Sequence, residues 1–375
     1  MLILGPLWDM SRTTDRRGGR DGSPRVVVVD DSPFMRGLIS DLLSDAGVAV
    51  VGEAGDGEEA LSVVAETRPD VVTMDVEMPG MGGLEAVERL MEETPTPVLM
   101  LSAHTDEGAE VTFEALDRGA VDFFAKPGGE VSTGVSRESD RLVEAVRSVA
   151  NADLDAATRE RDDPSGAGSR STGAAADSDA DAADVDGPLT VVIAASTGGP
   201  NAVERVLSAL PMADCRVVIV QHMPEAFTSR FAKRLDAASA YDVREASDGA
   251  RIGAGEALVA RGGSHTLVDS YRAGRLRVKL DEDDDSHTVT PAADVTMRSA
   301  AEVIDDPLVG VVLTGMGSDA AEGIRAMADA GARTLAQSED TCVIYGMPKR
   351  AVETGGVDAV YDLDDVAGAI VGGEA

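Results

Sequence analysis

Short apolar runs alternate with helix-like segments along the first part of the chain. β-branched or apolar residues dominate brief runs at residues 25–29, 48–51, 71–74, 98–101 and 121–124. Between these runs, apolar residues recur at helical spacing, as at Leu38, Ile39, Leu42 and Leu43. Strand–helix units whose strands are nearly unbroken apolar runs are typical of a parallel sheet that is covered by helices on both faces.

The same alternation returns in the second half of the chain. Buried strands are predicted at residues 189–195, 216–221 and 309–314, and apolar residues at helical spacing follow the first of them. The sequence therefore predicts an α/β protein with two doubly wound parallel-sheet domains, a five-stranded one and a larger one. In such sheets the working site lies at the carboxyl ends of the strands.

The composition changes abruptly between the two halves. Residues 151–187 are almost entirely Ala, Asp, Ser, Gly, Thr and Arg, and their net charge is −7. A segment with so few apolar side chains cannot offset its ordering entropy, so we predict a flexible acidic linker. The predicted organisation is a disordered leader at 1–23, a first domain at 24–150, the disordered linker at 151–187 and a second domain at 188–375.

Composition narrows the class of partner and the compartment. The 375 residues carry 33 Lys and Arg against 68 Asp and Glu, a net charge of −35 that disfavours binding to nucleic acid or anionic lipid. No apolar run approaches the ~20 residues that a membrane span needs. Cys215 and Cys342 are too few for a disulfide framework and are predicted to be buried thiols. We interpret the protein as cytoplasmic.

Polar residues end the predicted strands of the first domain. Asp30 and Asp31 follow the first strand, Asp75 the third, Ser102 the fourth and Lys126 the fifth. Three carboxylates at one sheet edge repel one another unless a hard cation joins them, and oxygen ligands favour Mg²⁺. An ammonium and a hydroxyl nearby would complete a cradle for a phosphoryl group. One such acid alone could cap a helix or face water, but residues at five matching strand ends favour a site.

These segments resemble a response-regulator receiver domain over residues 25 to about 146. The matching motifs are Val-Val-Asp-Asp-Ser-Pro-Phe-Met-Arg at 28–36, Met-Asp-Val-Glu-Met-Pro-Gly-Met at 74–81 and Phe-Phe-Ala-Lys-Pro at 123–127. The resemblance implies that Asp75 accepts phosphate from a chemotaxis histidine kinase. It also implies that Asp30, Asp31 and Asp75 hold Mg²⁺, together with the carbonyl of Glu77, and that Ser102 and Lys126 bind the phosphoryl oxygens.

Two positions of the first domain qualify this resemblance. Phe123 matches the aromatic switch position of receivers, although a core phenylalanine needs no switching role. Gly82 stands where relatives of this subtype commonly carry Asp, but it lies outside the phosphorylation site.

Ser196 stands where the first strand of the second domain turns into a helix. In Ser-Thr-Gly-Gly-Pro at 196–200 the glycines allow close approach and the proline is suited to begin the helix. Such a turn exposes a hydroxyl beside free helix-terminal N–H groups, which suits a nucleophile, although the motif is not G-x-S-x-G. It also suits binding of an anion or a nucleotide phosphate, so Ser196 alone leaves both interpretations open.

His222 and Asp319 favour the nucleophile. His222 lies at the carboxyl end of the second predicted strand, and Asp319 lies in the tight loop after the third. In a triad the imidazole takes the serine proton, and the carboxylate fixes the imidazole tautomer. Of the four histidines, His222 is the strongest candidate on position alone. A role of Asp319 as a helix cap is compatible with orienting the histidine.

Residues 189 to about 370 closely resemble the catalytic domain of chemotaxis protein-glutamate methylesterases. The matching motifs are Ala-Ser-Thr-Gly-Gly-Pro at 195–200, Gln-His-Met-Pro-Glu-Ala-Phe-Thr at 221–228, Leu-Thr-Gly-Met-Gly-Ser-Asp at 313–319 and Cys-Val-Ile-Tyr-Gly-Met-Pro at 342–348. The resemblance implies Ser196 as nucleophile, His222 as general base and acid, and Asp319 as its orienter. The N–H of Met316 is implied as an oxyanion donor. Ala195 and Ala320 replace glycines that are common in relatives.

The combined resemblance implies a phosphorylation-activated hydrolase of glutamate methyl esters on chemotaxis receptors, with no cofactor in the esterase domain. Release of ammonia from a receptor glutamine ranks second, because the amide leaving group is poorer.

Three alternatives are less favoured. A partner that binds without hydrolysis would not need the intact Ser196, His222 and Asp319 set. A receiver-gated transcription factor lacks a basic recognition helix, and a nucleotide cradle lacks a lysine after the glycines.

Overall fold

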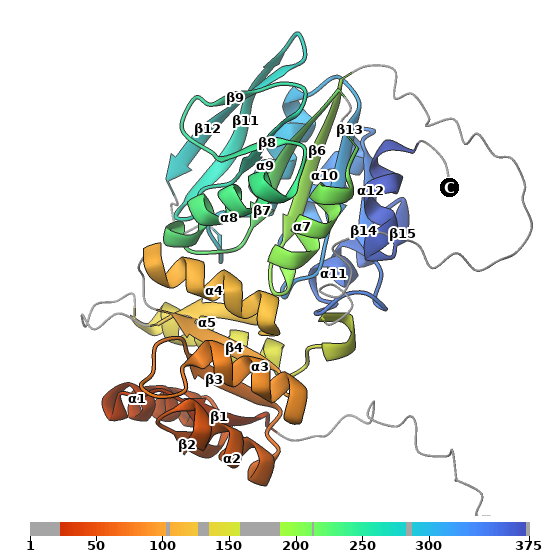
Figure 1. The fold of residues 1–375 in the computed structure, drawn as a ribbon. Helices are drawn as coiled ribbons and strands as arrows, with labels where there is room; N and C mark the ends of the chain where they lie inside the picture. The colour runs from red at the N-terminus through yellow and green to blue at the C-terminus, as the bar shows by residue number, and fades with distance from the viewer. Residues whose placement is uncertain are drawn as a thin grey trace, which may run out of the picture.

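The first lobe is a five-stranded parallel sheet with helices on both faces (Figure 1). The computed structural model describes residues 23–102, 106–126, 135–157, 188–211, 214–282 and 287–372. The strand order is β2-β1-β3-β4-β5. The strands are β1 (Arg25–Val29), β2 (Ala49–Ala54), β3 (Val71–Asp75), β4 (Val98–Ser102) and β5 (Asp122–Ala125). The helices are α1 (Pro33–Asp45), α2 (Gly57–Thr67), α3 (Gly83–Glu93), α4 (Asp106–Arg118) and α5 (Val135–Val149).

The apolar runs become strands because both of their faces are buried. Val26 and Val28 pack with α1 and α5 on one face of the sheet, whereas Val27 and Val29 pack with α2, α3 and α4 on the other. Ser32 caps α1 by accepting the Met35 N–H, which helps to end β1 and start the helix directly after the two aspartates.

Two predicted site residues lie one position earlier, relative to the ends of their strands, than the sequence predicted. Asp75 and Ser102 are the last residues of β3 and β4, and they do not follow those strands as the sequence predicted. Strand β2 also runs to Ala54, past its predicted end at residue 51. Ladder hydrogen bonds at the strand ends extend the sheet beyond the purely apolar run.

The second lobe is built on a seven-stranded parallel sheet with the order β15-β14-β13-β6-β7-β10-β8. These strands are β6 (Leu189–Ala195), β7 (Cys215–Gln221), β8 (Asp242–Glu245), β10 (Glu256–Val259), β13 (Leu308–Val312), β14 (Arg333–Gln337) and β15 (Ala359–Tyr361). An antiparallel sheet of order β11-β12-β9 joins it, formed by β9 (Arg251–Ile252), β11 (Ser264–Arg272) and β12 (Arg275–Glu282). The third predicted strand was set too far along the chain, since β13 ends at Val312 and not at residue 314.

Helices again cover both faces of the larger sheet. One face packs against α7 (Gly199–Ala209), α8 (Glu225–Ala238) and α12 (Leu363–Val371). The other packs against α9 (Ala293–Val303), α10 (Ala321–Asp329), α11 (Met347–Glu353) and the antiparallel sheet. Because β6, β7 and β13 are neighbours, the segments after these three strands are brought to one edge.

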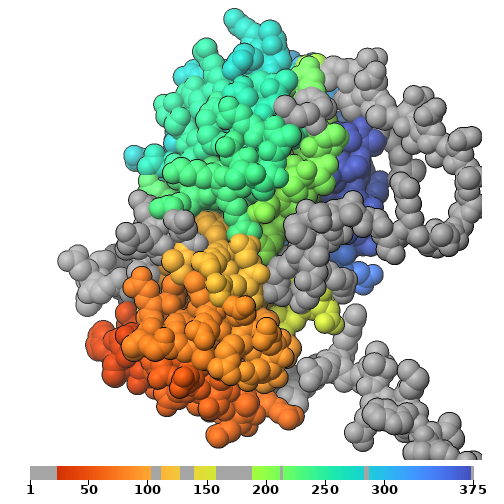
Figure 2. Space-filling model, viewed as in Figure 1, coloured from red at the N-terminus to blue at the C-terminus, as the bar shows by residue number. Residues whose placement is uncertain are grey.

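The two lobes pack against each other through α4 and α8, as Figures 1 and 2 show. The Phe113 and Phe231 rings stack with their centroids 5.9 Å apart, and Phe123 stacks on Phe227 at 4.6 Å. The Arg234 guanidinium donates to the Asp117 carboxylate at 2.7 Å. One continuous apolar core therefore runs from the first sheet into the second lobe.

Part of the predicted linker is ordered. Residues 154–157 form a helical turn in which Ala156 and Ala157 are buried, and the Asp153 N–H donates to the Val343 carbonyl at 3.1 Å. Residues 158–187 of the predicted linker and residues 1–22 of the predicted leader lie outside the described residues. Cys215 and Cys342 are both buried free thiols, as predicted. Among the described helices, none has the length and apolar character to cross a bilayer.

Candidate functional site

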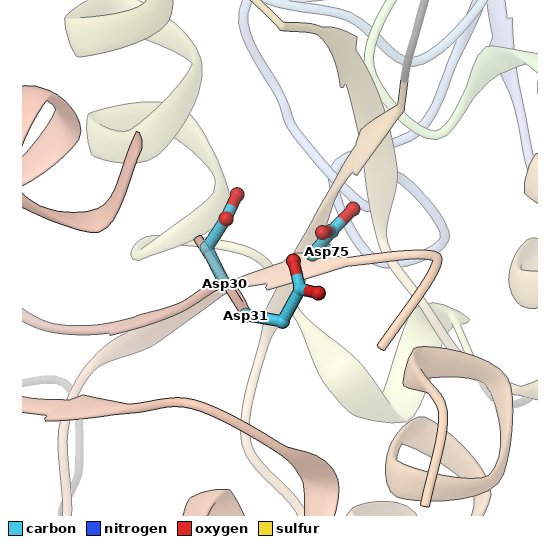
Figure 3. A group of neighbouring side chains, drawn as sticks. All are labelled: Asp30, Asp31 and Asp75. Atoms are coloured by element: carbon cyan, nitrogen blue, oxygen red, sulfur yellow. The ribbon is translucent and has the colours of Figure 1, made fainter. Parts of the chain in front are cut away.

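Three carboxylates gather at the carboxyl edge of the first sheet (Figure 3). Asp30 and Asp31 follow β1, and Asp75 ends the neighbouring strand β3; one oxygen from each lies within 4.8 Å of the others. Asp30 and Asp75 are buried, whereas Asp31 is exposed. A set of carboxylate oxygens that is open on one side matches the ligand preference of Mg²⁺.

Lys126 joins two of these carboxylates. Its Nζ lies 2.8 Å from an oxygen of Asp30 and 2.8 Å from an oxygen of Asp75. Burial raises the pKa of the Asp75 carboxyl above its ordinary value, although the hydrogen bond and charge of Lys126 oppose that shift. Ser102 is fully buried at the end of β4, and its carbonyl accepts the Lys126 N–H at 2.8 Å. All five predicted residues of this edge are thus brought together.

A tight turn places Ser196 at the end of β6. The Ser196 N–H donates to the Thr314 carbonyl at 3.0 Å, and the Ser196 carbonyl accepts from the Gly199 N–H at 2.7 Å. The Gln221 amide adds a hydrogen bond of 2.9 Å to the Ser196 carbonyl. A Cβ at Gly199 would lie 2.1 Å from the Gln221 amide oxygen and 2.8 Å from the Ala195 Cβ, so a larger residue here would displace the Gln221 side chain. Gln221 is a part of the site that sequence reasoning did not single out.

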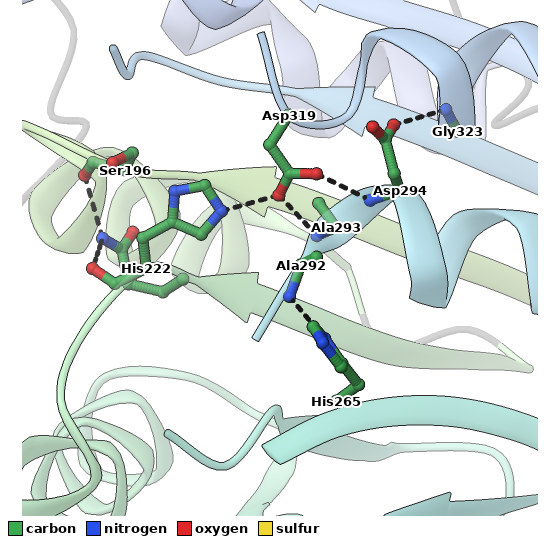
Figure 4. A network of polar contacts seen from close by, with 9 residues as sticks. Ser196, His222, His265, Ala292, Ala293, Asp294, Asp319 and Gly323 are labelled. Carbon is green, nitrogen blue, oxygen red and sulfur yellow. Dashed lines mark hydrogen bonds and ion pairs between the residues drawn. The ribbon is translucent and has the colours of Figure 1, made fainter. Parts of the chain in front are cut away.

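His222 and Asp319 are in direct contact. His222 Nε2 lies 2.7 Å from an Asp319 carboxylate oxygen, and both side chains are about one-tenth exposed. The His222 N–H donates to the Ala195 carbonyl at 3.1 Å, which ties the end of β7 to the end of β6. Figure 4 shows the imidazole between Ser196 and Asp319, with its other ring nitrogen on the side of Ser196.

Backbone groups of α9 hold the Asp319 carboxylate. The N–H groups of Ala293 and Asp294 donate to its two oxygens at 2.6 and 3.0 Å (Figure 4). Burial alone would raise the pKa of Asp319, but the hydrogen bond and charge of His222 and these two N–H groups lower it to about 2. Asp319 is therefore a stable anion that can hold the imidazole and stabilise its protonated form.

The loop after β13 lies against Ser196. A Cβ at Gly315 would lie 2.8 Å from the Ser196 Cβ, so the two backbones are in close contact. The Gly315 carbonyl accepts from the Met347 N–H at 2.7 Å, which fixes the loop. Among the residues that the structure describes, none accepts a hydrogen bond from the next N–H, that of Met316. A donor free in this way suits a developing oxyanion.

Residues of the first lobe reach the position beside Ser196. The Thr197 hydroxyl donates to the Asp122 carboxylate, which also accepts the Phe123 N–H at 2.9 Å. Burial raises the pKa of Asp122 to about 7, and these two hydrogen bonds oppose the shift only in part. No sequence pattern predicted this contact, because Asp122 lies inside a predicted strand and its partner belongs to the other lobe.

Two open hollows border the Met316 loop. One of about 430 Å³ lies between the end of α5 and this loop, and its lining includes Arg147, Asn151 and Met316. The other, of about 380 Å³, is lined by Gly317, Tyr345 and Lys349 among others. Ser196 lines neither of these two hollows and is itself partly buried.

Known proteins match both lobes. Residues 26–132 match the response regulator receiver domain family, and residues 191–370 match the CheB methylesterase family. A protein-glutamate methylesterase/protein-glutamine glutaminase of Haloarcula marismortui is 58% identical, over 92% of this chain and 96% of the relative. One of the same designation from Natronomonas pharaonis is 56% identical over the same shares. The chain belongs to this family.

The family assignment confirms the resemblances and the two-domain α/β fold that the sequence predicted, and it makes the chain a hydrolase. A solved structure of the CheB methylesterase catalytic domain of Thermotoga maritima is 35% identical. That match covers 49% of this chain and 98% of the other, with a TM-score of 0.47. From here on the first lobe is the receiver domain and the second is the methylesterase domain.

Proposed function

We propose that this chemotaxis methylesterase is activated by phosphorylation and hydrolyses glutamate methyl esters on chemotaxis receptors. The observation that carries the proposal is the 2.7 Å hydrogen bond between His222 and Asp319 at the sheet edge that also holds Ser196. The names of the relatives support the same reaction and add glutamine as a second substrate. The absence of disulfides among the described residues is consistent with action in the cytoplasm.

Ser196 is the proposed nucleophile. Its Oγ attacks the γ-carbonyl carbon of the ester, and its proton passes to the His222 nitrogen that faces it. The Asp319 anion stabilises the imidazolium that results. The tetrahedral oxyanion accepts a hydrogen bond from the Met316 N–H, and a donor of this kind typically contributes about 3 kcal/mol.

Two stages complete the reaction: the tetrahedral intermediate loses methanol, and water then hydrolyses the acyl-enzyme. The C–O bond to the methoxy group breaks, methanol leaves with the proton from His222, and an acyl-enzyme remains on Ser196. Water gives a proton to His222 and attacks the acyl carbon. The bond from that carbon to Ser196 Oγ then breaks, and His222 returns the proton to Oγ, which releases a glutamate carboxylate and restores the serine hydroxyl. With a glutamine substrate the same steps release ammonia, and the poorer leaving group makes this reaction slower.

The receiver domain supplies control. Asp75 is the proposed phosphoacceptor, and Ser102 and Lys126 bind the phosphoryl oxygens. The carboxylates of Asp30, Asp31 and Asp75 fit Mg²⁺, since one oxygen from each lies within 4.8 Å of the others and two of the three residues are buried. A bound Mg²⁺ would neutralise charge on the phosphodonor. When Asp75 carries a phosphoryl group, Lys126 gains a new acceptor in place of the carboxylate that it contacts at 2.8 Å.

The interface between the domains is the proposed gate. Lys126 follows the carboxyl end of β5, and the first two residues of that strand, Asp122 and Phe123, contact Thr197 and Phe227 of the methylesterase domain. Thr197 adjoins the proposed nucleophile, and Phe227 lies in the first turns of the helix after His222. Movement of β5 on phosphorylation would therefore loosen contacts beside the catalytic residues.

Asp75→Asn is expected to keep the basal esterase activity and to abolish its stimulation by a small phosphodonor such as acetyl phosphate. The amide cannot form the acyl phosphate, and the esterase residues are untouched. Rates of methanol release with and without phosphodonor measure both quantities. Full stimulation of the Asp75→Asn protein would contradict the gating role.

Phe123→Ala is expected to raise the activity of the unphosphorylated protein severalfold, because it removes the ring that stacks on Phe227 at 4.6 Å. Phe124→Ala is the matched control, since the Phe124 side chain packs on the other face of β5 within the receiver core. Basal methanol release by the two variants is compared at equal concentrations. Equal activation by both substitutions would indicate general loosening of the receiver and not a specific gate.

Methanol release from methylated receptor membranes tests the proposed activity. The full-length protein with phosphodonor is expected to release methanol, and unmethylated membranes provide the control. A serine-directed covalent probe is expected to label Ser196 and to fail in His222→Ala. If methylated membranes release no methanol and the probe does not react, the methylesterase domain binds without hydrolysis, and the proposal is wrong.

A further inference from the structure

Two helix N-termini beside the proposed triad are joined by reciprocal hydrogen bonds. Asp319 lies just before α10 and accepts the N–H groups of Ala293 and Asp294 in the first turn of α9. In return, the Asp294 carboxylate accepts the Gly323 N–H in the first turn of α10 at 2.5 Å (Figure 4). Each helix thus satisfies N–H groups at the start of the other.

The packing at this junction leaves little room for movement. A Cβ at Gly323 would lie 3.0 Å from the Asp294 Cα and 2.7 Å from the Met297 Cβ. The start of α10 therefore lies directly against α9, and the Asp294 side chain spans the contact. Because Asp319 is only four positions before Gly323, a shift of this junction moves the carboxylate that contacts His222.

The arrangement places two acids close together. Burial and the negative charge of Asp319 raise the pKa of Asp294, while the Gly323 N–H and the charge of Arg298 oppose that shift. Arg298 also pairs with Glu322 on α10. Each carboxylate lies at a helix N-terminus, where the helix dipole stabilises negative charge and offsets part of the mutual repulsion.

Asp294 differs from an ordinary helix cap in where its hydrogen bond goes. A capping side chain normally accepts an N–H of its own helix. The side chain of Asp294 instead accepts from α10, while its own backbone N–H is bonded to Asp319. One residue therefore contacts the Asp319 carboxylate directly and also anchors the helix that follows Asp319.

We propose that Asp294 is a positioning residue of the reaction: it fixes α10 against α9 and thereby holds Asp319 in the orientation that aligns His222. This inference rests on the proposed function, in which His222 is the base. Asp294 itself does not contact the reacting atoms. Its removal should slow the chemical step and leave substrate binding unchanged, since misplacement of a catalytic group lowers the rate of the chemical step.

The test compares full-length wild type with Asp294→Ala and Asp294→Asn. The amide oxygen of Asn can still accept the Gly323 N–H, so it should preserve the junction, whereas Ala removes the acceptor. Asp358→Ala is the matched control. Asp358 accepts two hydrogen bonds from Thr334 at the start of β14. It therefore lies at the amino-terminal end of the parallel strands, opposite the carboxyl ends that hold the proposed triad. The measurements are kcat and KM for methanol release from methylated receptor membranes.

For Asp294→Ala we expect kcat to fall by up to about 100-fold, with KM changed by no more than about twofold. Asp294→Asn should keep kcat within about threefold of wild type, and Asp358→Ala should keep the wild-type kcat. Wild-type kcat in Asp294→Ala, or an equal fall in Asp358→Ala, would overturn the proposal.

A second measurement does not depend on activity. With four histidines in the chain, the imidazole resonance of His222 can be assigned by comparison with His222→Gln. The resonance is expected to shift in Asp294→Ala and to stay near its wild-type position in Asp294→Asn and Asp358→Ala. An unshifted His222 resonance in Asp294→Ala would refute the positioning role. If the wild-type protein releases no methanol, the proposed function fails. The His222 resonance still decides whether Asp294 holds the His222–Asp319 pair in place.

Discussion

Replacing Ser196 by alanine is expected to lower phosphodonor-stimulated methanol release by about 10⁶-fold, the loss typical of removing the nucleophile from a serine triad. The Ser196 hydroxyl, directly after β6, is the protein group that forms a bond to the acyl carbon in the proposed mechanism. The turn itself should survive, because its hydrogen bonds to Thr314, Gly199 and Gln221 use the backbone of Ser196.

The measurement is methanol release from methylated receptor membranes, with Ser208→Ala as control. Ser208 lies exposed near the end of α7, the helix that begins after Ser196, and should behave as wild type. The double variant Ser196→Ala/His222→Ala should be no slower than Ser196→Ala alone, since the two residues act as a unit. A Ser196→Ala protein that retains more than about one-hundredth of the activity would exclude Ser196 as nucleophile.

The second large effect is expected for Asp319→Asn, which should lower kcat by about 10⁴-fold. Both oxygens of Asp319 accept backbone N–H groups, one from Ala293 and one from Asp294. Either orientation of an amide would therefore turn its NH₂ against one of these donors. The amide also lacks the charge that stabilises the imidazolium, so the loss has two physical causes.

The pH dependence of kcat shows whether the loss in Asp319→Asn comes from ionisation of a side chain. Asp319 has a pKa of about 2, so it is ionised throughout the range in which the enzyme would be assayed. Because this value is lower than the ordinary one, the stability that Asp319 contributes is present above pH 3.8 and is lost as the pH falls through about 2. The amide of Asp319→Asn does not ionise at any pH of the assay, so raising the pH should not restore the activity of that variant.

Asp358→Asn, at the opposite edge of the sheet, is the control for Asp319→Asn. Rates of methanol release are compared over the neutral pH range, together with thermal unfolding of each variant. The proposal predicts a large loss of kcat for Asp319→Asn only. Near wild-type kcat in that variant would remove Asp319 from the triad and leave it as a structural link between α9 and α10.

The sequence located the groups of both sites because each lies at a strand end. Nearly unbroken valine runs predict buried parallel strands, and the chemistry of such sheets lies after their carboxyl ends. That rule placed Asp30, Asp75, Ser196 and His222 correctly to within a residue. It located β13 less well: the strand ends at Val312, although the Leu313 N–H and the Thr314 carbonyl still hydrogen-bond to Ala194 and Ser196.

The predicted linker contains a short ordered part that its composition did not indicate. Asn151 to Gly187 was predicted to be disordered from its composition, yet Ala156 and Ala157 are buried, and the Asp153 N–H bonds to the Val343 carbonyl. Two small side chains carry almost no hydrophobic signal, but alanines can pack closely against a surface that another domain provides. Composition over a window does not reveal such a surface.

Patterns along the chain were enough to predict two parallel α/β sheets, an acidic cluster with a lysine, and a serine, a histidine and an aspartate that each follow a strand. These follow from local periodicity, which neighbouring residues fix. Tertiary packing brings His222 against Asp319 and places Ala293 and Asp294 of α9 where their N–H groups hold that carboxylate. It also brings Asp122 of the receiver to Thr197. Those contacts join segments distant in the chain, so they arise from how sheets and helices pack and not from any local pattern.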